Sequence, residues 1–224
     1  MEKFSDTYLR DFQLNILQPR EGYRFSVDSI LLTNFVRAPK EGRLLDIGTG
    51  CGVIALCLAR LYPNLKIVGI EIQRQLYEIA RENVKRNDLS HQVEIIHGDI
   101  TKAREIFEAG SFQVIVTNPP YRDPLTGRLC PIAQEALSRH EILLDLNSLV
   151  KAIRYLLCPG GHIFMIYPAD RAGILLHELV EARLEPKRIR NVHPGPNDEA
   201  RMFLVDAIKD ARKGGLRVLP PLFI

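Results

Sequence analysis

A side-chain amide, two prolines and an aromatic ring follow one another at Asn118, Pro119, Pro120 and Tyr121. The prolines fix φ and donate no backbone hydrogen bond, which leaves neighbouring carbonyls free to accept one. If the Asn118 side-chain oxygen and the Pro119 carbonyl accept both hydrogens of a planar amine, its nitrogen can pyramidalise and turn its lone pair toward an electrophile. Tyr121 can stack on a base taken out of its stack, which is worth about 1–3 kcal/mol. The segment predicts a catalytic site for a planar NH2 group, such as that of adenine or of a glutamine amide.

A glycine-rich stretch from Asp46 to Gly52 follows an apolar run. Glycines at such a place allow a tight turn and a close approach of the backbone to a ligand at a helix N-terminus. Dinucleotide-binding loops have the pattern G-x-G-x-x-G, with a pyrophosphate at the turn. Here the third glycine comes one residue early, and Asp46 would repel a pyrophosphate. A carboxylate at this place suits the ammonium of a methionine group, so the loop favours S-adenosylmethionine over a nicotinamide cofactor.

Two more carboxylates, Glu71 and Asp99, follow the next two expected strands. Ligands of open α/β sheets bind outside the carboxyl ends of the strands, so these groups and Asn118 are expected to face one crevice. The arrangement resembles the class I methyltransferases. This resemblance implies that the Asp46 loop holds the methionine portion of the cofactor, Glu71 the ribose and Asp99 the adenine amine, without a metal. The expected cofactor-binding residues here are Asp46, Gly48, Thr49, Gly50, Cys51, Gly52, Glu71, Ile72, Asp99, Ile100 and Asn118.

The elements that must position these groups alternate as in βαβ units. The expected strands are 43–47, 66–70, 93–97, 113–117 and 162–167, and the expected helices are 52–62, 73–87, 146–157 and 171–182. Two further strands, 186–193 and 201–208, are joined by a link too short for a crossover helix, so they are expected to pair antiparallel. We predict a Rossmann-like α/β domain (41–224) with a seven-stranded, mostly parallel sheet that ends in an antiparallel strand pair. A short extension (1–40), consisting of a hairpin and one helix, precedes it.

The composition is that of an ordinary soluble globular protein, with 46% hydrophobic and 25% charged residues among 224. No apolar run approaches the roughly 20 residues that span a bilayer, and the N-terminus does not resemble a secretory signal. The four cysteines show neither metal-ligand nor disulfide spacing. We expect a cytoplasmic protein with reduced thiols, no metal and no membrane partner, acting as a monomer or a weak homodimer.

Nearly the whole chain resembles the bacterial tRNA1(Val) adenine-37 N6-methyltransferase group. The resemblance rests on Gln18-Pro19, Gly22 to Asp28, the two motifs above, Ala136 to Glu141 and the tail from Gly214 to Leu222. It implies N6-methylation of a tRNA adenine next to the anticodon. It also implies that the segment before the first strand packs over the methionine end of the cofactor, with Tyr23, Phe25 and Asp28 as lining residues. Asp28 is equally expected to be the N-cap of the helix that runs to Phe35.

A tRNA partner requires basic groups near the crevice, and a net charge of +3 implies local patches rather than an overall field. The expected RNA-contacting residues are Arg20, Arg24, Arg122, Arg128, Arg139 and His140. A further basic run, Lys187 to Arg190, lies on a strand farther from the glycine loop and ranks below them.

Three alternative functions are open, of which two keep methyl transfer to an NH2 group and the third is not catalytic. Enzymes that methylate the glutamine N5 of peptide-chain release factors resemble this core and use the same four residues. They carry a helical substrate domain, whereas only about 40 residues precede the first strand here. Another RNA or DNA amine is the second alternative. A non-catalytic cofactor-binding or RNA-scaffold protein is the third, and the intact Asn118 to Tyr121 segment argues against it.

Overall fold

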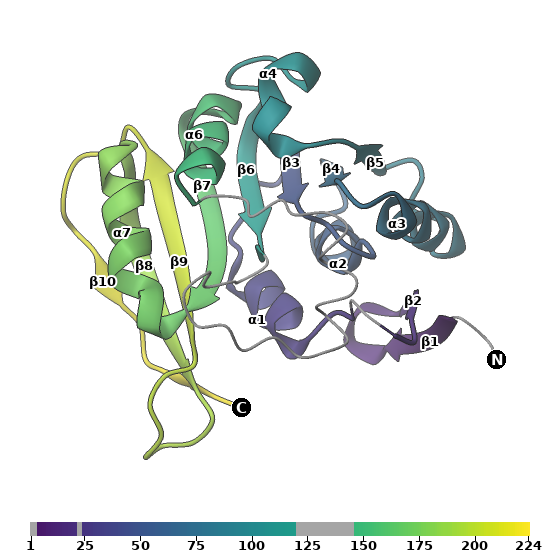
Figure 1. Cartoon of the computed structure of the whole chain (residues 1–224), viewed down its shortest axis with the longest axis horizontal. Coiled ribbons are helices and arrows are strands. Elements are labelled where there is room, and N and C mark those ends of the chain that lie inside the picture. The colour runs from purple at the N-terminus through teal and green to yellow at the C-terminus, as the bar shows by residue number, and fades with distance from the viewer. Residues whose placement is uncertain (1–3, 22–23, 120–145) are drawn as a thin grey trace.

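A large sheet forms the centre of the structure, a computed structural model that describes residues 4–21, 24–119 and 146–224 (Figure 1). Its strand order is β10-β8-β9-β7-β6-β3-β4-β5, and β11 also pairs with β8. The strands are β3 (Gly42–Ile47), β4 (Leu65–Glu71), β5 (Val93–His97), β6 (Phe112–Thr117), β7 (Leu157–Pro168), β8 (Leu184–His193), β9 (Met202–Lys209), β10 (Arg217–Val218) and β11 (Leu222–Phe223).

Helices cover both faces of this sheet and give a three-layered α/β structure. One face packs against α1 (Val27–Phe35), α2 (Val53–Leu61) and α3 (Arg74–Arg86). The other packs against α4 (Ala103–Ile106), α6 (Leu146–Leu156) and α7 (Ala172–Glu181). Successive strand residues alternate between the two cores, as Leu44 and Leu45 do. None of the helices in the described ranges is long and apolar enough to cross a membrane.

The predicted α/β class and the antiparallel β8–β9 pair are confirmed. The expected strand count of seven was wrong, because the described residues already form a sheet of nine strands. The tail adds β10 and β11, each two residues long and parallel to β8, and segments so short carry no readable periodicity. β9 lies between β7 and β8 and runs antiparallel to both. It is therefore β9, rather than the pair as a whole, that departs from the parallel order.

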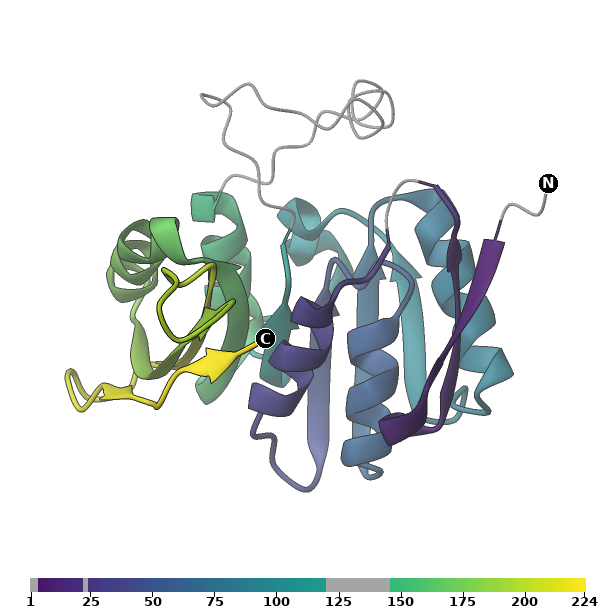
Figure 2. The same ribbon diagram turned by 90° about the horizontal axis from the view of Figure 1, so that it is seen from below.

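The N-terminal hairpin, β1 (Phe4–Leu9) and β2 (Leu14–Pro19), does not join the large sheet. Its strands pair with each other and are linked by a short 3-10 helix, η1 (Arg10–Phe12). Leu14 and Ile16 are fully buried in the core shared with α2 and α3. Figure 2 shows the hairpin lying over these helices, so its position is tied to the elements that follow the glycine loop.

The expected helices and strands are present, with shifted ends. β7 begins at Leu157 instead of residue 162, because the chain passes from α6 directly into a strand. In the pairing of β6 with β7, Phe112 lies opposite Leu157 but Val114 lies opposite His162. The extra residues of β7, which include Pro159 to Gly161, therefore bulge within the strand. Two 3-10 helices, η2 (Ile100–Lys102) and η3 (Ala169–Arg171), were not predicted.

Candidate active site

The strand order brings the sequence motifs to one edge of the sheet. β6, β3, β4 and β5 are neighbours and run parallel, so their carboxyl ends meet at the same edge. The glycine loop follows β3, Glu71 ends β4, Asp99 comes after β5 and Asn118 follows β6. Residues far apart in the chain therefore converge on one edge of the sheet.

The glycine loop is a tight turn whose backbone needs glycine. Gly48 and Gly50 have φ values of 69° and 58°, in the left-handed region that favours this residue. The amides of Gly48 and Thr49 both donate to the Ile70 carbonyl, at 2.9 and 3.1 Å, which ties the turn to β4. A Cβ added at Gly48 would meet nothing within 4 Å. The loop thus leaves open space at its first glycine, where a ligand can approach the backbone.

Asp46 is a fully buried carboxylate directly before this turn. Its Oδ2 accepts a hydrogen bond from the Thr49 hydroxyl at 2.6 Å. Its Oδ1 has no hydrogen-bond partner among the described residues. Burial raises the pKa of Asp46 from an ordinary value of 3.8 to about 7, and the Thr49 bond opposes this rise. A buried acceptor without a partner suits a cationic donor such as an ammonium group.

Glu71 closes the loop from the β4 side. It is 4% exposed, its Oε2 accepts from the Gly50 amide and its Oε1 from the Gln73 amide, each at 2.9 Å. Burial raises its pKa, and these backbone bonds counteract the rise. Each carboxylate oxygen keeps a further lone pair, so a ribose diol could still donate to it. Sequence reasoning missed this second, structural role of Glu71.

The residues near Glu71 differ in their exposure and in the groups that a ligand could contact. Ile72 is 39% exposed although it follows a buried strand, which makes its side chain available to a flat apolar group. Asp99 caps η2 by accepting from the Thr101 amide at 2.8 Å and is only partly buried. Ile100 and Cys51 are buried core side chains, and burial raises the pKa of the Cys51 thiol to about 12.

Asn118 and Pro119 lie directly after β6, where Asn118 is half-buried and Pro119 is buried. The Thr117 hydroxyl donates to the Ile47 carbonyl at 3.0 Å and holds the end of β6 against the end of β3. This places the first half of the motif beside the glycine loop. Seven expected site residues lie outside the described ranges: Tyr23, Pro120, Tyr121, Arg122, Arg128, Arg139 and His140.

The segment before α1 differs in detail from the expectation. The N-cap of α1 is Ser26, whose Oγ accepts from the Asp28 amide at 3.3 Å, so Asp28 lies in the first turn. The Ser26 hydroxyl also donates to the Asp28 carboxylate at 2.7 Å. Phe25 is partly buried against the core of α1 and α2. The alternative in which Asp28 is the N-cap was wrong.

Two of the expected RNA-contacting residues lie in the described part of the chain. Arg20 and Arg24 are both exposed. They bridge the end of β2 to the start of β1, with Arg20 Nε donating to the Phe4 carbonyl at 2.9 Å. Arg24 donates to the Ser5 hydroxyl at 3.4 Å. Both guanidinium groups are exposed, so phosphate can approach either of them.

Two of the three cations in the lower-ranked basic run at 187–190 are engaged by other parts of the protein. Arg188 is 6% exposed and pairs with Asp206 at 2.8 Å, with its guanidinium 4.8 Å from the centre of the Phe35 ring. Lys187 donates to the backbone carbonyls of Arg212 and Gly214. Tertiary contacts therefore bury one cation of the run and use another to hold the tail, so the run stays ranked below the other candidate RNA contacts.

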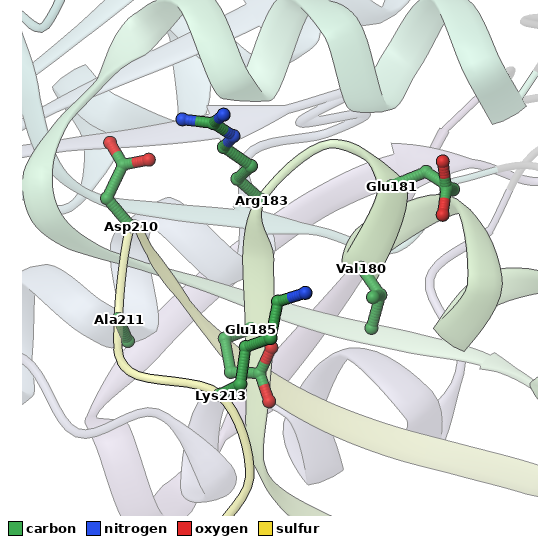
Figure 3. Close-up of a pocket in the computed structure, with 7 residues that line it drawn as sticks. All are labelled: Val180, Glu181, Arg183, Glu185, Asp210, Ala211 and Lys213. Carbon is green, nitrogen blue, oxygen red and sulfur yellow. The ribbon is translucent and has the colours of Figure 1, made fainter.

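A hollow shown in Figure 3 lies at the other edge of the sheet. It is formed where α7 and β9 end and β8 begins, and it is lined by Val180, Glu181, Arg183, Glu185, Asp210, Ala211 and Lys213. Asp210 pairs with Arg154 at 2.8 Å and Glu185 accepts from the Gly214 amide. The hollow holds none of the motif residues, so the candidate active site remains the edge with the glycine loop.

Comparison with known proteins agrees with this geometry. The model of the methyltransferase small domain matches residues 25–144. A tRNA1(Val) (adenine(37)-N6)-methyltransferase of Porphyromonas gingivalis is 32% identical over 86% of this chain and 77% of its own length. Proteins of the same name from Bacteroides thetaiotaomicron and Vibrio vulnificus are 31% and 28% identical, over 86% and 87% of this chain and 80% and 79% of their own.

Solved structures show the same fold at low sequence identity. A protein from Agrobacterium tumefaciens described as a predicted O-methyltransferase superposes with a TM-score of 0.68 at 21% identity, covering 87% of this chain and 86% of its own. A geranyl diphosphate C-methyltransferase from Streptomyces coelicolor does so with a TM-score of 0.60 at 13% identity, covering 82% and 80%. With its fold, its glycine loop and a family model that matches more than half of its residues, the chain belongs to the methyltransferase small domain family.

Proposed function

We propose that this protein transfers a methyl group from S-adenosylmethionine to the N6 amine of an adenine in tRNA, next to the anticodon. The observation that carries the proposal is the pairing of two features at one sheet edge. One is the buried Asp46 oxygen without a partner, beside an open glycine turn. The other is the Asn118-Pro119 segment that follows the neighbouring strand β6.

The described residues fit the cofactor part by part. Asp46 Oδ1 is an acceptor of the right charge for the methionine ammonium, and the space at Gly48 admits the chain beside it. Glu71 retains lone pairs for the ribose hydroxyls, and the exposed Ile72 offers an apolar surface to the adenine ring. Asp99, with one oxygen used in capping η2, can accept from the adenine amine. We assign the remaining lining positions to Tyr23, Phe25 and Asp28.

S-adenosylmethionine supplies an electrophilic methyl group when bound. The work of the protein is then to orient the acceptor amine, because its lone pair is delocalised into the purine ring. The Asn118 side-chain oxygen and the Pro119 carbonyl accept the two N–H hydrogens, which turns the lone pair out of the ring plane. The Thr117 bond to Ile47 holds this pair of acceptors at a constant distance from the glycine loop. Tyr121 stacks on the extruded base, and water takes up the released proton.

The relatives favour tRNA adenine over a protein glutamine as the acceptor. Three of them carry the name tRNA1(Val) (adenine(37)-N6)-methyltransferase, and each is similar to this chain over at least 86% of its length. The RNA would dock on Arg20 and Arg24 at the hairpin and on Arg122, Arg128, Arg139 and His140. A tRNA substrate implies a cytoplasmic enzyme, and we propose that it acts as a monomer or a weak homodimer.

Methyl transfer from labelled S-adenosylmethionine to two acceptors tests the proposal. One acceptor is total tRNA from a strain that lacks this modification, and the other is a purified peptide-chain release factor. Nucleoside analysis should show N6-methyladenosine, and Asn118→Ala should serve as the inactive control. Label in the release factor alone would replace the adenine assignment with the glutamine one.

Replacing Arg122 and Arg128 with alanine should weaken tRNA binding and reduce its salt dependence, with cofactor affinity unchanged.

A further inference from the structure

Two asparagines, one in α3 and one at its C-cap, hold the outer edge of the hairpin as a neighbouring strand would. The Leu17 amide donates to Asn83 Oδ1 and Asn83 Nδ2 donates to the Leu17 carbonyl, both at 2.8 Å. One helical turn later, Asn87 makes the same two bonds to the backbone of Asn15, at 2.8 and 2.9 Å. Side chains four apart on a helix are about 5–6 Å apart, close to the advance of two residues along a strand. The two amides therefore match the periodicity of β2.

The two asparagines differ in the use of their second N–H. A side-chain amide has two hydrogens to donate. Asn87 gives its second one to the Asn83 carbonyl of its own helix, at 2.8 Å. Asn83 gives its second one to the Cys51 carbonyl, at 2.9 Å. Asn83 is fully buried, so this amide joins the hairpin, α3 and the glycine loop at one point without competition from water.

Cys51 stands between two glycines of the loop, Gly50 and Gly52, which have φ values of 58° and 86°. Glycine backbones have many alternative conformations, so the loop shape depends on contacts from outside it. Glu71 supplies one contact through the Gly50 amide, and Asn83 supplies another through the next carbonyl. These two bonds hold the Gly50–Cys51 segment at both of its ends, at the Gly50 amide and at the Cys51 carbonyl.

We infer that Asn83 is a positioning residue for the cofactor loop, and that it couples the placement of the N-terminal hairpin to cofactor binding. This inference rests on the proposed function, since it concerns the loop that holds S-adenosylmethionine. Asn87, which anchors the same strand without touching the loop, supplies the matched control. The hairpin also carries Arg20 and Arg24, so a tRNA held there acts on the cofactor loop through the same amide.

The test compares Asn83→Ala with Asn87→Ala in the full chain. Both variants lose a pair of bonds to β2, so both should lower the melting temperature. Only Asn83→Ala should raise the Kd for S-adenosylhomocysteine in calorimetry, by about tenfold, the effect of losing one hydrogen bond that fixes the site. In turnover, KM for S-adenosylmethionine should rise with kcat nearly unchanged. Equal affinities in the two variants would overturn the inference, because the effect would then be general loosening.

A measurement on the wild-type protein covers the case in which Asn83→Ala does not fold. S-adenosylhomocysteine should slow hydrogen exchange of the Leu17 amide, which is bonded to Asn83, more than that of the Asn15 amide. An unchanged rate at Leu17, or an equal change at both amides, would contradict the coupling. Failure of the wild-type protein to bind S-adenosylhomocysteine at all would instead refute the proposed function.

Discussion

The buried carboxylate of Asp46 makes a quantitative prediction about pH. Its pKa rises from 3.8 to about 7 on folding because burial disfavours the charged form. The unfolded chain therefore loses this proton near pH 4, whereas the folded protein holds it up to about pH 7. The destabilisation is absent at low pH, grows between these two values and is complete above pH 7. At about 1.36 kcal/mol for each pKa unit, Asp46 lowers the free energy of unfolding by about 4 kcal/mol at pH 8.

Asp46→Asn removes the titration while keeping an oxygen that can accept from the Thr49 hydroxyl. We expect urea unfolding of the ligand-free variant to give a higher free energy of unfolding than wild type at pH 8. The difference should shrink by about 4 kcal/mol as the pH falls to 4. Glu71, whose pKa is also raised by burial, is present in both proteins, and because the Glu71 charge contributes to the raised pKa of Asp46, the difference curve reports Asp46 together with this coupling.

The Asp46 charge should affect cofactor binding in the opposite direction to its effect on stability. A bound ammonium stabilises the ionised carboxylate, so S-adenosylhomocysteine should bind wild type more tightly as the pH rises through 7. Asp46→Asn should bind it more weakly, with little dependence on pH between 6 and 8. Calorimetry across this range measures both effects. A constant stability difference between the two proteins from pH 4 to 8, or wild-type affinity in the variant, would refute the reasoning.

Three further predictions concern other parts of the molecule. Asn118→Ala should lower kcat by about two orders of magnitude or more, because Asn118 orients the amine, while the Kd for S-adenosylhomocysteine stays near wild type. Equal losses of turnover and of S-adenosylhomocysteine affinity would make Asn118 a cofactor ligand. Glu71→Ala should lower the cofactor affinity. It should also lower the free energy of unfolding by about 2–4 kcal/mol, because two backbone amides lose their acceptor. Unchanged thermal stability would rule out the loop-closing role of Glu71. Arg188→Met should lower the free energy of unfolding by up to about 3–5 kcal/mol, because Asp206 would keep only the His162 ring as a partner among the described residues. The salt dependence of tRNA binding should not change, and a reduced salt slope would instead place Arg188 on the RNA surface.

The sequence by itself determined the features that depend on local pattern. The αL backbone of the turn requires glycine at Gly48 and Gly50, and the apolar periods of strands and helices follow from which face is buried. The short link between β8 and β9 permits only an antiparallel pair, as the structure has it. The βαβ order also implies that Asp46, Glu71, Asp99 and Asn118 meet at one sheet edge, since parallel strands share their carboxyl ends.

Only the tertiary structure decided which polar groups are exposed and what they hold. From the sequence, Arg188 is expected to be a surface cation, but in the structure it is buried in an ion pair with Asp206 on the neighbouring strand β9. Lys187 is likewise expected to be available to a partner, but it donates to the tail, which folds back onto β8. Asn83 gives no signal in the sequence, because its three partners are carbonyl and amide groups of the backbone at Leu17 and Cys51. Every residue type presents such groups, so the partner of a buried amide is set by the packing of distant segments rather than by a local pattern.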